Sequence, residues 1–458
     1  MTKKIFHSNK SEDDNHTYHS PLEKKVNELL SPFQEYIRKQ ATASIALLVC
    51  TFIALAWASI PSLAQHYEKL IHTSIGFHLS HHFITEPLLF WVNDVLLTLF
   101  FFLVGLEIKR EFLVGELSNH KQSFLVIFAA IGGMLLPASI YTLINIGTHH
   151  MKGYGIPMAT DTAFALGILT CFKSKLPKSI FTFTAALAII DDIGVILVVA
   201  IFYTSGLNLN MLYLAAGFTS ILILFNYAGV RKPIPYIVIG LLLWAAIETS
   251  GIHGTIAGII VAFIIPARPQ KGPFQFLQKI RKLLERFEKN KKETSMVLKN
   301  QQQHRVLEEM QVIAQQATTP LQRWESKLEL PITLLILPLF CLVNAGIPIR
   351  PNLLSDVLTN KVSLGILIGL VIGKPLGVLL FTRISLWLKI GKLPTETSMR
   401  QLAQAAALTG IGFTMSLFIT NLSFDDPHII LLAKAAILIA SFCSALLGTF
   451  LILKADTQ

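Results

Sequence analysis

The chain has 458 residues, of which 52% are hydrophobic and 15% are charged. An ordinary soluble domain is roughly 25% charged, so this composition excludes a typical array of soluble domains and indicates a chain that lies largely in lipid. The formal net charge of +11 raises the question of a nucleic-acid partner, and the distribution of the basic residues answers it below.

The first 41 residues are polar, and we expect them to form an N-terminal extension ahead of the first apolar run. No small-residue cleavage site follows that run, so the sequence does not indicate a cleavable signal peptide.

A helix that crosses a bilayer needs roughly 20 mostly apolar residues. Twelve runs meet or nearly meet this requirement, near residues 42–60, 88–108, 122–146, 155–172, 178–203, 209–229, 233–249, 252–266, 330–348, 362–382, 400–421 and 429–453. The sequence therefore predicts an all-α polytopic membrane protein with about twelve transmembrane helices, whose transmembrane domain covers residues 42–453.

The basic residues indicate how this domain is oriented. Most of the 39 lysine and arginine residues lie in the segments that would face one side of the membrane, and few lie on the other side. By the positive-inside rule, both termini are cytoplasmic. The net positive charge is thus mainly a topology signal, and we expect contact with membrane lipid and no nucleic-acid partner.

Two segments outside the spans have a character of their own. Residues 71–80 largely alternate apolar and polar side chains, which is strand periodicity and predicts a short hairpin in the first external loop. Residues 268–328 form a long, basic, glutamine-rich cytoplasmic loop of helical composition. This loop is either a solvated or lipid-facing basic helix or a regulatory element.

Charged side chains occur inside the predicted spans, and Asp191, Asp192 and Lys374 lie more than a turn from any predicted end. A charge at mid-bilayer costs roughly 2.5–3.5 kcal/mol. Three of them would together cost about 8–10 kcal/mol, which is comparable to the net stability of a whole protein. A buried ion pair that fixes packing is the structural explanation, and an ion pathway is the functional one.

Asp191 and Asp192 are consecutive, so on a helix they point about 100° apart and can both reach one cavity. Two carboxylates in one low-dielectric site do not both stay ionised cheaply, so they hold either protons or a cation. Hard cations such as sodium prefer oxygen ligands. Competition between protons and a metal ion for these oxygens is the physical basis of an antiporter.

Two spans contain breaks in corresponding places of the two halves. Residues 155–162 and 408–414 bring glycine, proline and hydroxyl residues into mid-span, which is typical of interrupted helices at a transporter's binding site. An anion suits the exposed N-terminal ends of such helices, and a cation suits the C-terminal ends. We expect Asp161 and Lys374 to have these roles.

His253 lies just inside the eighth predicted span and can titrate near neutral pH. It is either a hydrogen-bonded structural residue or a pH sensor.

Together these motifs resemble the NhaA family of sodium/proton antiporters. The matching segments are ND (93–94), FFLVGLEIKRE (101–111), PMATDTAFALG (157–167), AALAIIDDIG (185–194), SGIH (250–253), IGKPLG (372–377) and GIGFTMS (410–416). The resemblance runs from about residue 40 to the C-terminus. It does not extend to the first 40 residues, and the 268–328 loop is longer than in familiar members.

The resemblance implies an often dimeric inner-membrane protein with inverted repeats, in which helices 4 and 11 are interrupted and cross. It implies that Asp192 is the principal sodium ligand, that Asp191 is essential and interacts with Lys374, and that Thr160 and Asp161 lie beside the site. Asp192, Asp191 and Thr160 are thus the expected ligands of the transported metal ion.

The resemblance also implies electrogenic exchange of Na+, and commonly Li+, for H+, with no cofactor besides these ions. Glu107 and Glu111 match residues linked with pH activation. The hairpin at 71–80 is expected to pair across a homodimer, because an isolated hairpin is marginal in water and its edges can pair.

Two other functions compete with exchange. A sodium-coupled symporter of an organic solute has the same general architecture. An intramembrane enzyme with paired aspartates is disfavoured, because membrane aspartyl proteases draw their aspartates from different helices and because Ile193, Gly194 and Val195 after Asp192 leave no DDxxD motif.

Overall fold

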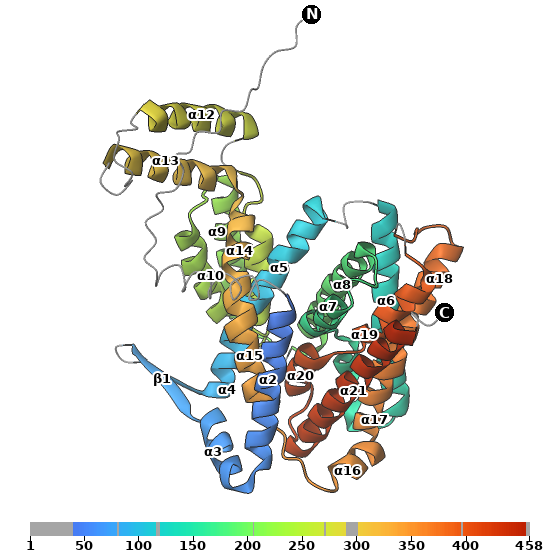
Figure 1. The fold of residues 1–458 in the computed structure, drawn as a ribbon. Helices are drawn as coiled ribbons and strands as arrows, with labels where there is room; N and C mark the ends of the chain where they lie inside the picture. The colour runs from blue at the N-terminus through green and yellow to red at the C-terminus, as the bar shows by residue number, and fades with distance from the viewer. Residues whose placement is uncertain are drawn as a thin grey trace, which may run out of the picture. The chain divides into compact units, whose positions relative to one another are not determined.

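The computed structural model describes residues 40–79, 82–115, 120–204, 206–269, 272–289, 301–394 and 397–454. Internal contacts divide the chain into two units (Figure 1). The larger one, here called the membrane unit, comprises Lys39–Arg268 and Pro320–Gln458, and the smaller one comprises Met1–Arg38 and Pro269–Thr319. The extension predicted over residues 1–41 lies almost entirely outside the described residues.

Helices make up nearly all of the membrane unit. Its first part contains α2 (Gln40–Ser59), α3 (Pro61–Ile71), α4 (Leu88–Phe90), η1 (Trp91–Leu96), α5 (Leu97–Val114), α6 (His120–Ile144), η3 (His149–Met158), α7 (Thr162–Cys171), α8 (Lys178–Phe202), α9 (Leu209–Tyr227), α10 (Pro233–Glu248) and α11 (Thr255–Ile264). Its second part contains α14 (Pro320–Pro331), η5 (Ile332–Ile336), α15 (Leu337–Asn344), α16 (Leu353–Thr359), α17 (Lys361–Ile368), η6 (Gly369–Gly373), α18 (Lys374–Trp387), α19 (Met399–Thr409), α20 (Phe413–Ser423) and α21 (Pro427–Lys454). The smaller unit contains α12 (Pro273–Lys289) and α13 (Gln301–Ala317).

Within the described residues, eight helical stretches are long and apolar enough to cross a membrane. They are Thr42–Ser59, Leu88–Val114, Ser123–Ile144, Lys178–Phe202, Leu209–Tyr227, Pro320–Asn344, Lys361–Trp387 and Pro427–Lys454. A ninth results if α19 and α20, which are bent by 44° at their break, count as one span. The protein is therefore a multi-pass membrane protein. The predicted spans at 155–172, 233–249 and 252–266 are shorter or broken helices, so the number twelve stays a prediction.

The predicted hairpin exists, but its bounds differ from residues 71–80. Strand β1 (Ser74–Leu79) pairs antiparallel with β2 (His82–Pro87). Ile71 instead ends α3, because the helix continues through the apolar residues that the alternation seemed to assign to a strand. The indole N–H of Trp91 donates to the carbonyl oxygen of Ile75 at 2.9 Å and fastens the hairpin to η1.

Two long spans widen into a π-helical turn shortly before a proline. In the Lys361–Trp387 span, η6 precedes Pro375, and in the Pro320–Asn344 span, η5 precedes Pro338. Proline has no N–H to donate, and its ring clashes with the carbonyl group four residues earlier, so a regular α-helix cannot continue unchanged there. The widened turn at η6 ends directly before Lys374.

Helices α6 and α18 pack unusually closely. A Cβ atom added at Gly132 of α6 would overlap the carbonyl oxygen of Gly377 on α18, and one added at Gly377 would overlap the carbonyl oxygen of Gly132. These two glycines therefore let the two backbones come together, as small residues do in membrane helix pairs.

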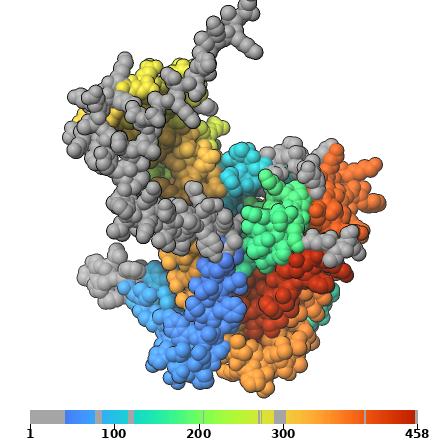
Figure 2. All heavy atoms as spheres, viewed as in Figure 1, coloured from blue at the N-terminus to red at the C-terminus, as the bar shows by residue number. Residues whose placement is uncertain are grey.

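The outer face of the membrane unit is apolar. Figure 2 shows α2 at its surface, where the exposed side chains include Ile45, Val49 and Phe52. Exposed aliphatic and aromatic side chains continue on α9 and α10. Such a surface suits the hydrocarbon core of a bilayer.

Candidate functional site

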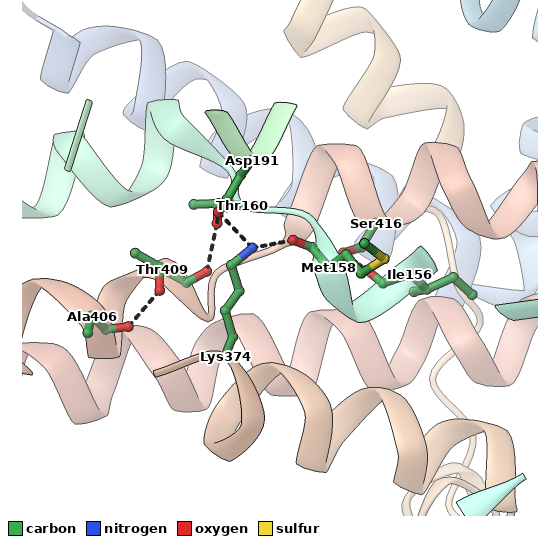
Figure 3. A network of polar contacts seen from close by, with 8 residues as sticks. All are labelled: Ile156, Met158, Thr160, Asp191, Lys374, Ala406, Thr409 and Ser416. Atoms are coloured by element: carbon green, nitrogen blue, oxygen red, sulfur yellow. Dashed lines mark hydrogen bonds and ion pairs between the residues drawn. The ribbon is translucent and has the colours of Figure 1, made fainter. Parts of the chain in front are cut away.

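Asp191 and Asp192 lie side by side in the middle of α8, and both are buried. Lys374, which is fully buried on α18, places its Nζ 2.9 Å from Oδ2 of Asp191 (Figure 3). Since neither side chain of this ion pair is exposed, each charge depends on the other and on nearby polar groups for stabilisation.

The hydroxyl and carbonyl groups around this ion pair come from the two helix breaks. Thr160 Oγ1 is 2.8 Å from Oδ2 of Asp191 and 3.1 Å from the carbonyl oxygen of Thr409. Lys374 Nζ also donates to the carbonyl oxygen of Met158, at the C-terminal end of η3 (Figure 3). Asp191 thus contacts one side chain from α18, Lys374, and one from the break between η3 and α7, Thr160.

The two breaks contact each other directly. Between η3 and α7, the backbone N–H of Asp161 donates to the carbonyl oxygen of Ile411, in the break between α19 and α20, at 2.6 Å. Because mid-span residues have no water to satisfy their backbone groups, each break relies on the other for hydrogen bonds.

Asp161 caps two helices with one carboxylate. Its Oδ1 accepts the backbone N–H of Phe164 at 3.2 Å and so caps α7. Its Oδ2 accepts the N–H of Thr414 at 3.0 Å and the Thr414 hydroxyl at 2.6 Å. The N-cap residue of α20, Gly412, offers no side-chain acceptor, so the cap for α20 comes from the other break.

One oxygen on each aspartate of the pair is left open. Oδ1 of Asp191 and Oδ1 of Asp192 are buried and have no hydrogen-bond partner within the described part of the chain. Gly133 of α6 lies beside this opening, since a Cβ there would stand 4.0 Å from Oδ1 of Asp191. Buried polar oxygens without a partner are costly, and a proton or a cation would satisfy them.

The donor set suits a hard, weakly held cation. In the residues that the structure describes, no cluster of three or more His, Cys, Asp and Glu side chains could hold a metal ion. Two carboxylates with hydroxyl and carbonyl oxygens nearby match sodium or lithium, which prefer oxygen ligands. This chemistry fits an ion that enters and leaves the protein.

The acidic residues predicted for pH regulation, Glu107 and Glu111, lie on α5 and not on the helices that carry the ion pair. Arg110 pairs with Glu111 at 3.1 Å and with Glu325 of α14 at 3.1 Å, which links α5 to α14. Glu107, one turn earlier on α5, is close enough to Asp192 for their charges to interact. Sequence reasoning did not single out Glu325, because its partner Arg110 lies more than 200 residues away.

His253 does not join the aspartate network. It lies in the turn between α10 and α11, where burial lowers the pKa of its imidazole while a hydrogen bond with the Tyr203 backbone opposes this effect. The neighbouring Gly254 donates its N–H to Oε2 of Glu248 at 2.7 Å.

A second polar cluster, which sequence reasoning missed, joins three helical segments. Asn93 of η1 and Asn344 of α15 exchange amide hydrogen bonds of 3.3 and 2.7 Å, and Asn421 of α20 donates to Oδ1 of Asn344 at 2.8 Å. Asn93 belongs to one of the segments that resemble the family, but nothing in the sequence indicated that these three amides meet. The carbonyl groups of Met158 and Thr409 gave no signal either, because every residue has a carbonyl.

Known proteins match this chain along almost its whole length. The profile of the family described as Na+/H+ antiporter 1 matches residues 34–452. Na(+)/H(+) antiporter NhaA 2 of Psychromonas ingrahamii is 42% identical over 96% of this chain and 91% of its own length. Na(+)/H(+) antiporter NhaA 1 of Shewanella denitrificans is 42% identical over 93% of this chain and 95% of its own length. The solved structure of the sodium proton antiporter MjNhaP1 from Methanocaldococcus jannaschii at pH 8 aligns with 91% of this chain and 99% of that chain, at 14% identity and a TM-score of 0.44.

Proposed function

The chain belongs to the NhaA family and is a sodium/proton antiporter, and we propose that Asp191 and Asp192 are the groups that carry its ions. The observation that supports this assignment is the pair of open carboxylate oxygens on adjacent, buried aspartates. Thr160, whose hydroxyl reaches Asp191, is the third proposed ligand of the transported sodium.

Exchange follows from competition at this site. When the aspartates are protonated, sodium finds no charged ligand. When they release their protons, the same oxygens bind sodium, so a bound cation and bound protons exclude each other. Interacting carboxylates titrate as a cluster and not as separate residues.

The number of charges at the site favours electrogenic transport. If both carboxylates give up a proton before one sodium ion binds, two positive charges move one way for each one that moves the other way. Lithium is also a hard cation that prefers oxygen ligands, so we propose that it is accepted too.

The charges near the breaks have a supporting role in this proposal. Asp161 lies at the N-terminal ends of α7 and α20 and compensates their positive dipole ends, while Lys374 lies at the C-terminal end of η3 and compensates its negative end. The breaks belong to two crossing helices, the fourth and eleventh of twelve spans in an inverted repeat.

The remaining assignments concern orientation, assembly and regulation. We propose an inner-membrane protein with both termini cytoplasmic, which forms a homodimer through the hairpin β1–β2. Glu107, Glu111 and His253 are the proposed contributors to pH regulation beyond the binding site itself.

The test is transport by the purified chain in proteoliposomes with a trapped pH-sensitive dye. Adding sodium or lithium without any organic solute should change the internal pH, and a membrane-potential dye should respond in the same preparation. Sodium uptake that needs an organic solute and moves no protons would instead identify the symporter. Below the pH range in which the cluster titrates, the apparent dissociation constant for sodium should fall about tenfold for each unit by which the pH rises, for each proton that sodium displaces. An apparent dissociation constant for sodium that does not depend on pH would contradict competition between protons and sodium.

A further inference from the structure

The smaller unit contains a pair of helices that the antiport site does not use. α12 and α13 lie side by side (Figure 1) and pack through buried side chains that include Leu283 and Val306. Arg286 of α12 also approaches Glu309 of α13 at 3.9 Å. These contacts satisfy one side of α12 and leave another side without a partner in the described residues.

The uncovered side of α12 carries large apolar side chains. Phe274, Leu277 and Leu284 are 72%, 64% and 49% exposed. Their spacings of three and seven residues place them along one stripe of the helix. Single exposed apolar residues are ordinary on a protein surface, but an aligned apolar stripe marks an interaction surface.

Most of the charged residues of the helix are basic. Besides the stripe, α12 carries Lys279, Arg281, Lys282, Arg286 and Lys289 against only Glu285 and Glu288. An apolar stripe on a helix rich in lysine and arginine is the pattern of a helix that lies in the interface of an anionic membrane. Lysine and arginine near such a surface are attracted to its anionic headgroups.

A short stretch of chain tethers this helix to the membrane unit. Only residues 269–272 separate the membrane unit, which ends its first part at Arg268, from the start of α12 at Pro273. At roughly 3.5 Å per residue, this connection reaches at most about 18 Å from Arg268 to Pro273. A surface tethered so closely needs little intrinsic affinity to stay bound.

We propose that α12 binds the anionic phospholipid surface of the membrane that contains the protein. Phe274, Leu277 and Leu284 insert at the boundary between headgroups and acyl chains, while the basic side chains contact the phosphates. The occupant is lipid because the stripe combines an apolar surface, a positive charge and a permanent attachment to a membrane protein.

Spin labels on the full-length chain test this proposal. The background is a variant that lacks the four native cysteines and retains exchange. In it, a single cysteine replaces Leu277 or Leu284. The matched control has a cysteine in place of the exposed Gln275, which lies on a different side of α12. The labelled protein is reconstituted into phosphatidylcholine vesicles with or without phosphatidylglycerol, and accessibility to oxygen and to a water-soluble nickel chelate is measured.

With phosphatidylglycerol, labels at 277 and 284 should be more accessible to oxygen than to nickel, the label at 275 should show the reverse, and high salt should diminish the difference. Nickel accessibility at all three positions in both lipids would overturn the proposal in favour of a solvated helix. Equal burial without phosphatidylglycerol would overturn the role of anionic lipid, and spin–spin broadening between labels at 277 would identify a second copy as the occupant.

Hydrogen exchange on the unmodified chain provides a measurement without any substitution. The amides of α12 should exchange more slowly in vesicles that contain phosphatidylglycerol than in phosphatidylcholine alone. The Leu277→Asp/Leu284→Asp variant should lose this difference, and an equal rate of exchange of the unmodified chain in both lipids would contradict the proposal.

Discussion

At the scale of single residues, the two adjacent aspartates have different surroundings. Asp191 contacts Lys374 and Thr160 through its Oδ2, whereas Oδ1 of Asp192 is buried without a hydrogen-bond partner among the described residues. Because of this asymmetry, Asp192 is the more available ligand for an incoming cation. Asp191 must first release one of its present partners, Lys374 or Thr160.

We expect Asp191→Asn and Asp192→Asn each to reduce sodium-driven proton release to the level of vesicles without the protein. Each change removes a charged ligand while keeping the size of the side chain. The control is Asp356→Asn, which alters an exposed aspartate of α16 and should leave transport unchanged. Near-normal activity of Asp192→Asn would remove it as the ion ligand.

Lys374→Ala should move sodium-dependent activity to higher pH by at least about one unit, or eliminate it. The ionised form of Asp191 loses its partner at 2.9 Å, and the free energy of a close buried ion pair corresponds to more than one pH unit. The measurement is the pH profile of exchange, with Lys361→Ala on an exposed lysine as the control. A midpoint that stays in place or moves to lower pH would contradict the role of Lys374.

Asp161→Ala should lower the free energy of unfolding by about 1–4 kcal/mol, because two helices lose their caps at once. Asp161→Asn should cost less, since asparagine is an equally good cap but has only one acceptor oxygen for the two helices. Thermal unfolding in detergent compares the two variants. Equal unfolding temperatures for both variants would argue against the double cap.

At the scale of elements, the site depends on how closely the helices approach one another. Lys374 begins α18, and Gly132 and Gly377 let α18 lie directly against α6. The position of the lysine relative to α8 therefore depends on a backbone contact one turn further along α18.

Gly377→Ala should destabilise the protein by about 1–3 kcal/mol, the usual range for overpacking a dense interior. The new methyl group would overlap the backbone of α6, which cannot move as easily as a side chain. Gly217→Ala on α9 is the matched control, because a Cβ there meets nothing within 4 Å. Because alanine has a higher helix propensity than glycine, Gly217→Ala should not destabilise the protein, and the same loss of thermal stability in both variants would contradict the role of close packing.

At the scale of the whole molecule, the hairpin is the described element best placed for assembly. Its sheet has only the two strands β1 and β2 among the described residues, so each strand has an outer edge without a strand neighbour. Open strand edges invite pairing with another chain.

Replacing residues 74–87 with a short glycine–serine linker should shift the protein from dimer to monomer in mild detergent and leave part of the transport activity. The hairpin lies at residues outside the aspartate site, so the site itself should persist. Light scattering gives the mass of the protein in detergent, and a variant that remains a dimer would contradict the proposed role of the hairpin.

The sequence by itself determined the class of the protein and the positions of most spans, and it pointed to the residues of the proposed site. Apolar runs, the distribution of lysine and arginine, and charges inside spans are local or one-dimensional patterns, and the high cost of a charge in lipid makes Asp191, Asp192 and Lys374 conspicuous. The hairpin was also predicted, but its start was placed three residues too early, because strand periodicity and the end of a helix overlap at Ile71, and the predicted range left out the second strand, His82–Pro87.

Only the tertiary structure decided which groups meet. Asp161 caps α20 across more than 250 residues, Arg110 pairs with Glu325, and Asn344 joins Asn93 and Asn421. Such contacts depend on how helices far apart in the chain pack, and the carbonyl and amide groups that complete them have no signature in the sequence. The physical reason is that a buried polar group must find a partner wherever the fold supplies one, so its choice of partner is a property of the packed structure.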